Sequence, residues 1–204
     1  NADVLVLSGD IFVAVDLIPE RNFGFNDISK YDRITNFLNN VSTEFKEVIL
    51  IMGNHEHYHG DFATSADKIR TMLRYNDCGN VHFLDKEFVV IEDTLFVGGT
   101  LWTDMNKEDP LTLTFADRRM NDYNGVNNSN KDDVHFTSNI YATKEDGSYD
   151  YSKVVSKNFH TRPANFAPMD SVEDHKAMLA TIDGIYNTLF VNSPVVVCGH
   201  HAPC

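Results

Sequence analysis

The sequence predicts an α/β fold, and two observations lead to this class. Three apolar runs, rich in β-branched residues, have the length and composition of buried strands: residues 4–7, 48–52 and 195–197. The segments between them space their apolar side chains as one face of a helix does, most clearly at residues 27–42 and 62–75. Strands that alternate with helices favour a sheet whose strands are buried on both faces.

Local signals set the bounds of the other expected elements. Asp27 is a suitable N-cap for the first helix, and Cys78-Gly79-Asn80 ends the second. Ser171-Val172-Glu173-Asp174 resembles a capping box, with Asp in place of the usual Glu or Gln, and predicts a helix to about Leu189. Three further short strands are expected at Val81–Leu84, Phe88–Ile91 and Leu95–Val97.

The length of the chain suits a single domain over residues 1–204. Within it, residues 103–168 are polar and show weak apolar periodicity, apart from a possible short helix near Phe115–Met120. A long irregular stretch inside a compact domain is usually functional or mobile. We therefore expect residues 103–168 to be an inserted cap or loop region that influences specificity.

Composition limits the partners and the compartment. The net charge of −13 disfavours long nucleic acid, whose backbone such a chain would repel. No apolar stretch is long enough to span a bilayer, and no signal peptide is visible, so no membrane partner is expected. The three cysteines form no C-x-x-C pair, which favours a reducing compartment and a cytoplasmic location.

The most informative pattern lies where the apolar runs end. Each run closes on glycine followed by a potential metal ligand: Gly9-Asp10, Gly53-Asn54-His55 and Gly199-His200-His201. Sites in α/β sheets form at the carboxyl ends of the strands, so these side chains can converge although they are distant in sequence. A carboxylate, an amide oxygen and imidazoles suit Mn²⁺, Fe or Zn²⁺. Adjacent side chains diverge, so only one residue of the pair His200-His201 should face a metal.

These strand ends resemble the calcineurin-like metallophosphoesterases. Gly9-Asp10, Gly53-Asn54-His55-Glu56 and His200 match blocks of that family, and GNHEHYHGDF, GGTLWTD, MNDY, SVEDHKAML and VVVCGHHAP are similar to stretches of a bacterial and phage subgroup. The resemblance implies a four-layer α/β/β/α sandwich holding two divalent ions, Mn²⁺, Fe²⁺ or Zn²⁺. It makes Asp10 the bridging carboxylate, Asn54 and His200 ligands of the second ion, and His55 the catalytic histidine.

The activity implied is hydrolysis of a small phosphate ester by a metal-bridging hydroxide, with His55 assisting departure of the leaving group. Two family blocks have no counterpart: D-x-H upstream of Gly9-Asp10, and G-H-x-H at the end of the chain. Asp133-Val134-His135 spells D-x-H but lies in the polar region. We therefore expect an interior fragment of a longer gene product, with the first metal site largely lost.

Two other classes of function fit parts of the sequence. His55-Glu56-x-x-His59 spells the zinc-protease signature, which requires both histidines on one face of a helix. A strand and Gly53 come immediately before this motif, and Gly60-Asp61 comes immediately after it. The segment therefore has room for barely one helical turn, which disfavours the protease. His57 and His59 are then expected to face solvent, and Glu56 to support either the turn or the residues that hold the metal ligands. A non-catalytic metal-binding or scaffold protein is the second alternative.

Overall fold

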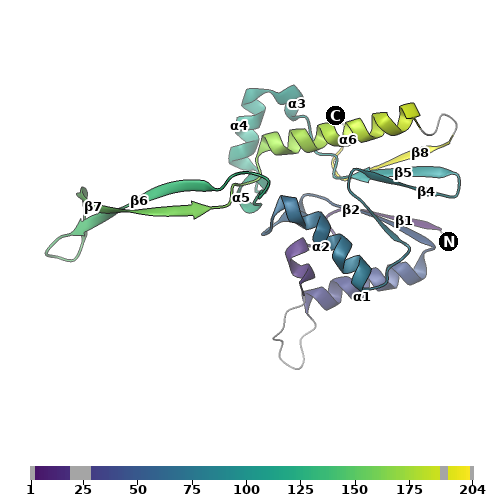
Figure 1. Ribbon diagram of the computed structural model, residues 1–204, viewed down its shortest axis with the longest axis horizontal. Coiled ribbons are helices and arrows are strands. Elements are labelled where there is room, and N and C mark those ends of the chain that lie inside the picture. The colour runs from purple at the N-terminus through teal and green to yellow at the C-terminus, as the bar shows by residue number, and fades with distance from the viewer. Residues whose placement is uncertain (1–2, 19–28, 189–192, 203–204) are drawn as a thin grey trace.

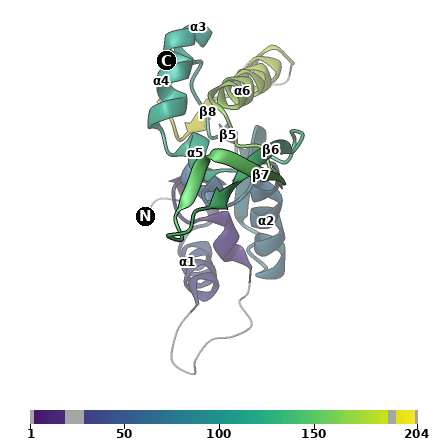
Figure 2. The same ribbon diagram turned by 90° about the vertical axis from the view of Figure 1, so that its left-hand side faces the viewer.

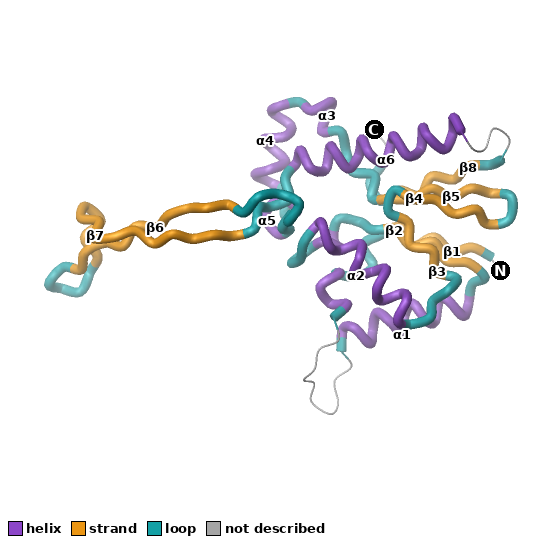
Figure 3. Tube along the Cα trace, viewed as in Figure 1, coloured by secondary structure: helices purple, strands orange, loops and turns teal. Residues whose placement is uncertain are grey.

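The computed structural model describes residues 3–18, 29–188 and 193–202. The described residues form a mixed α/β structure with three small sheets, which confirms the predicted fold class (Figures 1 and 3). The helices are α1 (Lys30–Glu44), α2 (Phe62–Tyr75), α3 (Met105–Glu108), α4 (Pro110–Arg119), α5 (Asp122–Gly125) and α6 (Pro168–Thr188), with the short 3-10 helices η1 (Ala14–Leu17) and η2 (His55–His57). The strands are β1 (Val4–Ser8), β2 (Glu47–Ile51), β3 (Val81–Leu84), β4 (Glu87–Ile91), β5 (Thr94–Gly99), β6 (Val134–Thr143), β7 (Tyr149–Arg162) and β8 (Val195–Gly199).

The first sheet is parallel, in the order β1-β2-β3, and α1 and α2 cover one of its faces. Its central strand β2 is apolar along almost its whole length, and residues 48–51 are at most 1% exposed. Leu38 of α1 and Ile69 of α2 pack against it and are fully buried. A continuous apolar run therefore marks a strand that is covered on both faces.

The second sheet has the order β4-β5-β8, with β4 antiparallel and β8 parallel to β5. Met178 and Ile185 of α6 pack on Leu95 and Val97 of β5, so this helix covers the outer face. The inner face meets the first sheet in a cluster that contains Ile49, Ile51, Leu84 and Cys198. Gly98 lies at this contact, where a Cβ atom would come within 2.7 Å of Ile51 and 2.8 Å of Leu84.

Two helix starts differ from the sequence prediction. Helix α1 begins at Lys30 and is capped by Ser29, whose hydroxyl accepts the N–H of Asp32. Asp27, the expected cap, lies outside the described residues. Helix α6 begins at Pro168, so the capping box at Ser171 is wrong: Asp170 accepts the N–H of Ala167 instead. Proline is favoured at a first helical position because its fixed φ suits the helix and the missing N–H costs nothing there.

Residues 103–168 are more regular than predicted. The short helix expected near Phe115–Met120 is α4, which starts earlier, at Pro110. The long hairpin of β6 and β7 was not predicted, and it projects away from the rest of the molecule (Figures 1 and 2). Helices α3 to α5, in contrast, share a buried cluster with Trp102, Phe166 and Val172. The region therefore has two parts, one packed on the body and one extended.

No helix among the described residues has both the length and the apolar character needed to cross a membrane. Cys78 and Cys198 are free thiols and buried, and burial raises the pKa of both. Cys204 lies outside the described residues. Cys198 belongs to the contact between the two sheets, as expected of a small core residue.

Candidate metal centre

Strand register brings the three glycine-ending strands to one place. Ser8 pairs with Ile51, so β1 and β2 end side by side and Gly9-Asp10 lies next to Met52-Gly53. Gly99 pairs with Gly199, so β5 and β8 also end together. The carbonyl of Thr100 then accepts the backbone N–H groups of His200 (3.3 Å) and His201 (3.1 Å). The GGTLW stretch thus holds the histidine pair at the edge that both sheets share.

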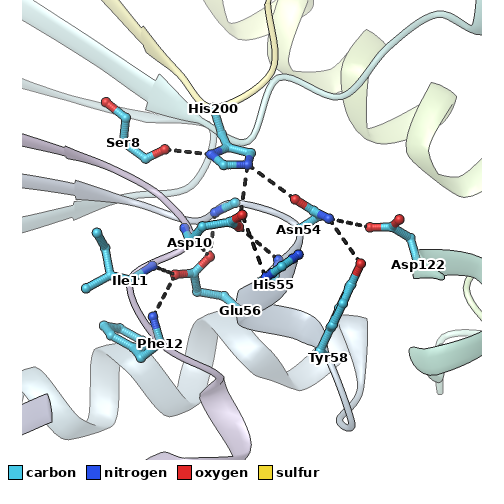
Figure 4. Close-up of polar contacts among 11 residues, drawn as sticks. Ser8, Asp10, Ile11, Phe12, Asn54, His55, Glu56, Tyr58, Asp122 and His200 are labelled. Atoms are coloured by element: carbon cyan, nitrogen blue, oxygen red, sulfur yellow. Dashed lines mark hydrogen bonds and ion pairs between the residues drawn. The ribbon is translucent and has the colours of Figure 1, made fainter. Parts of the chain in front are cut away.

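Asp10, Asn54 and His200 meet at this edge, as the sequence predicts (Figure 4). His200 Nδ1 lies 2.7 Å from the carbonyl oxygen of Ser8. A carbonyl oxygen can only accept a hydrogen bond, so Nδ1 carries a proton, and in the neutral form of the ring Nε2 has the lone pair. Nε2 lies 3.2 Å from Asn54 Oδ1 and 3.4 Å from Asp10 Oδ1.

The amide orientation of Asn54 is determined in the same way. Its Nδ2 donates to Asp122 Oδ1 at 2.7 Å and to the hydroxyl of Tyr58 at 3.3 Å. Since a carboxylate only accepts, the amide oxygen must point the other way, toward His200. Asp122 is 4% exposed and reaches Asn54 from α5, in the region predicted to be an insertion. The pKa of Tyr58 is raised, first by burial and then by the charge of Asp122.

Three electron-pair donors therefore converge: Nε2 of His200, Oδ1 of Asn54 and a carboxylate oxygen of Asp10. Ligand atoms bound to one ion at about 2.0–2.2 Å, with ordinary bond angles, lie about 3.0–3.4 Å apart. The distances from His200 Nε2 to Asn54 Oδ1 and to Asp10 Oδ1 both fall in this range.

The turn that carries Asp10 is held by the buried carboxylate of Glu56. Gly9 and Asp10 both have positive φ, 84° and 57°, which is unfavourable for Asp10. Glu56 is 1% exposed and accepts the N–H groups of Asp10 (2.9 Å), Ile11 (2.7 Å) and Gly53 (2.7 Å). Charge-assisted bonds of this kind offset the backbone strain. The expectation that Glu56 supports the turn is confirmed.

Gly53 is required because the site is compact. A Cβ atom on Gly53 would overlap the Asp10 carboxylate and come within 2.8 Å of the His200 ring. A side chain there would separate the two ligands. Gly53 therefore allows the Asp10 carboxylate and the His200 ring to approach each other closely. It does not adopt a positive φ.

His55 lies at the rim of the site. Its backbone N–H donates to Asp10 Oδ1 at 3.0 Å, and its ring Nδ1 lies 3.8 Å from Asp10 Oδ2. The side chain is 54% exposed and stacks on Tyr58, with ring centroids 4.4 Å apart. The ring is thus placed beside the trio, outside it, and open to solvent.

The zinc-protease arrangement is absent from this segment. Helix η2 ends at His57, and His59 has a φ of 58°, so His55 and His59 do not share a helix face. His59 is exposed, as predicted. The prediction for His57 is wrong: it is 2% exposed and packs on Phe62, with centroids 4.9 Å apart. Burial lowers its pKa to about 4, so the ring is neutral at pH 7.

A cavity of about 710 Å³ opens beside His200, and Leu179, Val197, Asp104 and His175 line it. His201 faces this cavity and Trp102, while the His200 ring turns at 74° to it, toward Asp10. Burial lowers the pKa of His201, and the neighbouring His200 lowers it further. The expected divergence of the two histidines is confirmed, and a ligand in the cavity would lie next to the trio.

The second ion implied by the family resemblance has no such set of ligands here. Within residues 3–18, 29–188 and 193–202, no group of three or more His, Cys, Asp and Glu side chains is arranged to hold a metal ion. The trio consists of one aspartate, one asparagine and one histidine. His135, from the D-x-H sequence in the polar region, is on β6 and bonds to Thr161 of β7 at 2.9 Å. The dinuclear centre remains a prediction.

Sequence reasoning missed Asp122. The phrase MNDY, which contains it, was only one of several matches to the family, and nothing in its spacing suggested a role. A signal was available in principle, since an acidic residue followed by Tyr-Asn-Gly in a polar region is typical of a short helix or turn. Its contact with Asn54, 68 residues away, depends on tertiary packing.

In comparisons with known proteins, no family model, no curated protein and no solved structure matches the chain.

Proposed function

We propose that the chain is a metal-dependent phosphoesterase of the calcineurin-like class. On this proposal the two sheets and their covering helices are the four-layer α/β/β/α sandwich of that family. Asp10, Asn54 and His200 bind a divalent ion, Mn²⁺, Fe²⁺ or Zn²⁺, and His55 is the catalytic histidine. The substrate is a small phosphate ester, and the location is cytoplasmic, in keeping with free thiols at Cys78 and Cys198.

One observation carries the proposal: the lone pair of His200 Nε2 faces two oxygens, at 3.2 and 3.4 Å. When Nε2 is unprotonated, all three groups are electron-pair donors, and a divalent cation between them would bind all three. The orientation of each side chain has a visible cause, in the carbonyl of Ser8 for His200 and the carboxylate of Asp122 for Asn54. Partners of this kind typically orient metal ligands in proteins.

Each residue of the site would have its own role in ester hydrolysis. A divalent ion, when bound, supplies Lewis acidity toward a phosphoryl oxygen and lowers the pKa of water. Asp10, Asn54 and His200 would hold it, and Asp122 would keep Asn54 in place. His55 would stand at the solvent side and donate a proton to the leaving oxygen, which a solvent-exposed ring beside a carboxylate can do.

A second candidate is a metal-binding protein without catalytic activity. The observation that favours it is that the described residues provide one trio of ligands and no second set. Phosphoryl transfer in two-metal sites needs ions about 3.5–4 Å apart. On this reading the chain binds one ion and does not turn over esters.

The two candidates are separated by measuring Mn²⁺ binding and ester hydrolysis together. Hydrolysis of bis(p-nitrophenyl) phosphate and p-nitrophenyl phosphate is followed with added Mn²⁺, Fe²⁺ or Zn²⁺. It is followed for this chain and for any longer product of the same gene. His55→Ala should abolish turnover and leave Mn²⁺ binding intact. His59→Ala, at an exposed histidine four residues away, is the matched control and should change neither.

Binding without turnover by every form of the chain would favour the non-catalytic candidate. If no form binds an ion, and neither ester is hydrolysed with any of the three metals, both candidates fail.

A further inference from the structure

Strands β6 and β7 form an extended two-stranded ribbon, here called the arm, that leaves the body beside α5 (Figures 1 and 2). No residue of either strand belongs to any of the four hydrophobic clusters found among the described residues. Its sheet has two strands, so both outer edges of the ribbon lack a neighbouring strand within the described part of the chain. Isolated two-stranded ribbons are marginally stable in water, so a further contact would stabilise this one.

The two edges of the arm differ in chemistry. Strand β7 carries Asp150, Lys153, Lys157 and Arg162, and charged side chains of this kind protect an edge from pairing. Strand β6 has ten residues, VHFTSNIYAT, without a charged residue or a proline. A long, uncharged edge rich in β-branched and aromatic residues is a template for another strand.

One face of β6 is apolar and uncovered. Its even-numbered residues are Val134, Phe136, Ser138, Ile140 and Ala142. Val134, Phe136 and Ile140 are 38%, 46% and 39% exposed, although alternation of this type is typical of a strand with one buried face. The pattern indicates a strand face that a further contact would cover.

We propose that β6 pairs with β6 of a second copy of this chain. The pairing is antiparallel, about a two-fold axis at Ser138, and makes a four-stranded sheet in the order β7-β6-β6-β7. In this register Phe136 lies opposite Ile140 of the second copy, and Val134 lies opposite Ala142. Two-fold pairing is self-complementary, so each apolar residue gains a cross-strand apolar neighbour twice.

Charge favours the arms over the bodies as the place of contact. Residues 131–162 contain five basic and five acidic residues, so the net charge of −13 belongs entirely to the rest of the chain. Two bodies of this charge repel each other, whereas the β6 edges bring no like charges together. The same acidity disfavours nucleic acid as the partner of the arm.

The length of β6 sets the strength expected of the dimer. Ten residues of antiparallel strand extend about 34 Å, which gives an interface below the standard size of about 1,600 Å². We therefore expect a reversible dimer, populated at micromolar concentrations and above. The proposal is independent of what the metal centre does.

Sedimentation velocity of the whole chain, over a concentration series up to about 200 µM, tests the pairing. The chain should shift from monomer to dimer as its concentration rises. Ser138→Lys places two lysines opposite each other on the two-fold axis and should weaken the dimer at least 10-fold. Asn158→Lys is the matched control: it introduces the same charge directly opposite Ser138 on β7, one strand from the proposed interface. This control should dimerise as the unchanged chain does.

A mixture of two oppositely charged variants shows whether a monomeric variant has lost only the pairing of β6 or has a damaged arm. Ser138→Lys and Ser138→Glu chains should each be monomeric alone and should form a mixed dimer when combined. A chain that is monomeric throughout the series overturns the proposal. So does a Ser138→Lys dimer of unchanged affinity, or an Asn158→Lys chain as weak as Ser138→Lys. If Ser138→Lys and Ser138→Glu fail to combine, β6 does not pair in this register and the proposal falls.

Discussion

Glu56 supports the candidate metal centre without pointing into it. Its carboxylate gathers backbone N–H groups from Asp10, Ile11 and Gly53, which belong to two strand ends 43 residues apart along the chain. Asp122 acts in a comparable way on the side chain of Asn54. At the scale of single residues, the site thus depends on the hydrogen-bond acceptors Glu56 and Asp122 as much as on the candidate ligands themselves.

Glu56→Gln should reduce the free energy of unfolding by about 2–4 kcal/mol, because an amide group would face backbone N–H groups that now bond to Oε2. Urea denaturation measures the change. Glu145→Gln, at an exposed position in the turn of the arm, is the control and should shift stability by less than about 0.5 kcal/mol. Equal effects of the two substitutions would show that the buried carboxylate is not the cause.

His57 should make the fold sensitive to acid. Burial, opposed by Asp85 and aided by Lys86, lowers its pKa from 6.5 to about 4, and both ring nitrogens lack partners among the described residues. The unfolded chain therefore binds a proton between these two pKa values and the folded chain does not. Stability is complete above pH 6.5 and falls by about 3 kcal/mol as the pH drops to 4.

Chemical denaturation at pH 7 and at pH 4.5 tests this expectation. His57→Phe removes the titrating group and should lose clearly less stability between the two pH values than the unchanged chain. His59→Phe, at the exposed neighbour, should retain the full loss. If His57→Phe loses as much stability as the unchanged chain, the acid sensitivity arises elsewhere.

At the scale of elements, register decides which side chains meet. The pairs Ser8–Ile51 and Gly99–Gly199 place the ends of β1, β2, β5 and β8 at one edge. A shift of one residue in either pair would turn the ligands to the opposite face, because side chains alternate along a strand. Gly9 allows the ends of β1 and β2 to approach closely, and Gly53 leaves room for the contact between Asp10 and His200.

Gly53→Ala should lower Mn²⁺ affinity at least 10-fold, because the added methyl group displaces both the Asp10 carboxylate and the His200 ring. Titration calorimetry measures the affinity. Gly184→Ala is the control, since a Cβ atom there meets nothing within 4 Å and the position lies inside α6. It should retain the affinity and raise stability by about 0.5–1 kcal/mol. Unchanged Mn²⁺ binding by Gly53→Ala would contradict the assignment of these ligands.

At the scale of the whole molecule, the body and the arm are energetically distinct. The body buries its apolar side chains in clusters on and between the sheets, whereas the arm contributes to none of them. Its base is secured by the ion pair of Lys131 with Asp170 at 2.5 Å and by the bond from Asn128 N to the carbonyl of Ala164 at 2.7 Å. We therefore expect only part of the region predicted as an insertion to be dispensable for folding.

Replacement of residues 132–162 by a short Gly-Ser loop should change the thermal midpoint by less than about 3 °C, because little apolar burial is lost from the body. Removal of all of residues 103–168 should instead prevent folding, since it deletes Tyr123, Val126 and Phe166 from a buried cluster. Calorimetry compares the two deletions. A fall of 10 °C or more on removal of the arm alone would show that the arm stabilises the body.

The sequence by itself determined the α/β class, most of the strands and the three residues that meet at the candidate site. Apolar runs and helical spacing are local patterns, and glycine followed by a ligand residue at each strand end is visible without a structure. Its resemblance to a phosphoesterase family supplied the proposed chemistry, which remains to be tested.

Only the tertiary structure decided the rest. The partnership of Asn54 with Asp122, the burial of His57 and the fourfold use of Glu56 as an acceptor depend on contacts between distant segments. The arm was missed because Asn, Asp, Ser and Lys dominate residues 121–150 and obscure the short alternation of apolar residues within β6. Local patterns reveal which residues must be buried, whereas packing decides what they are buried against.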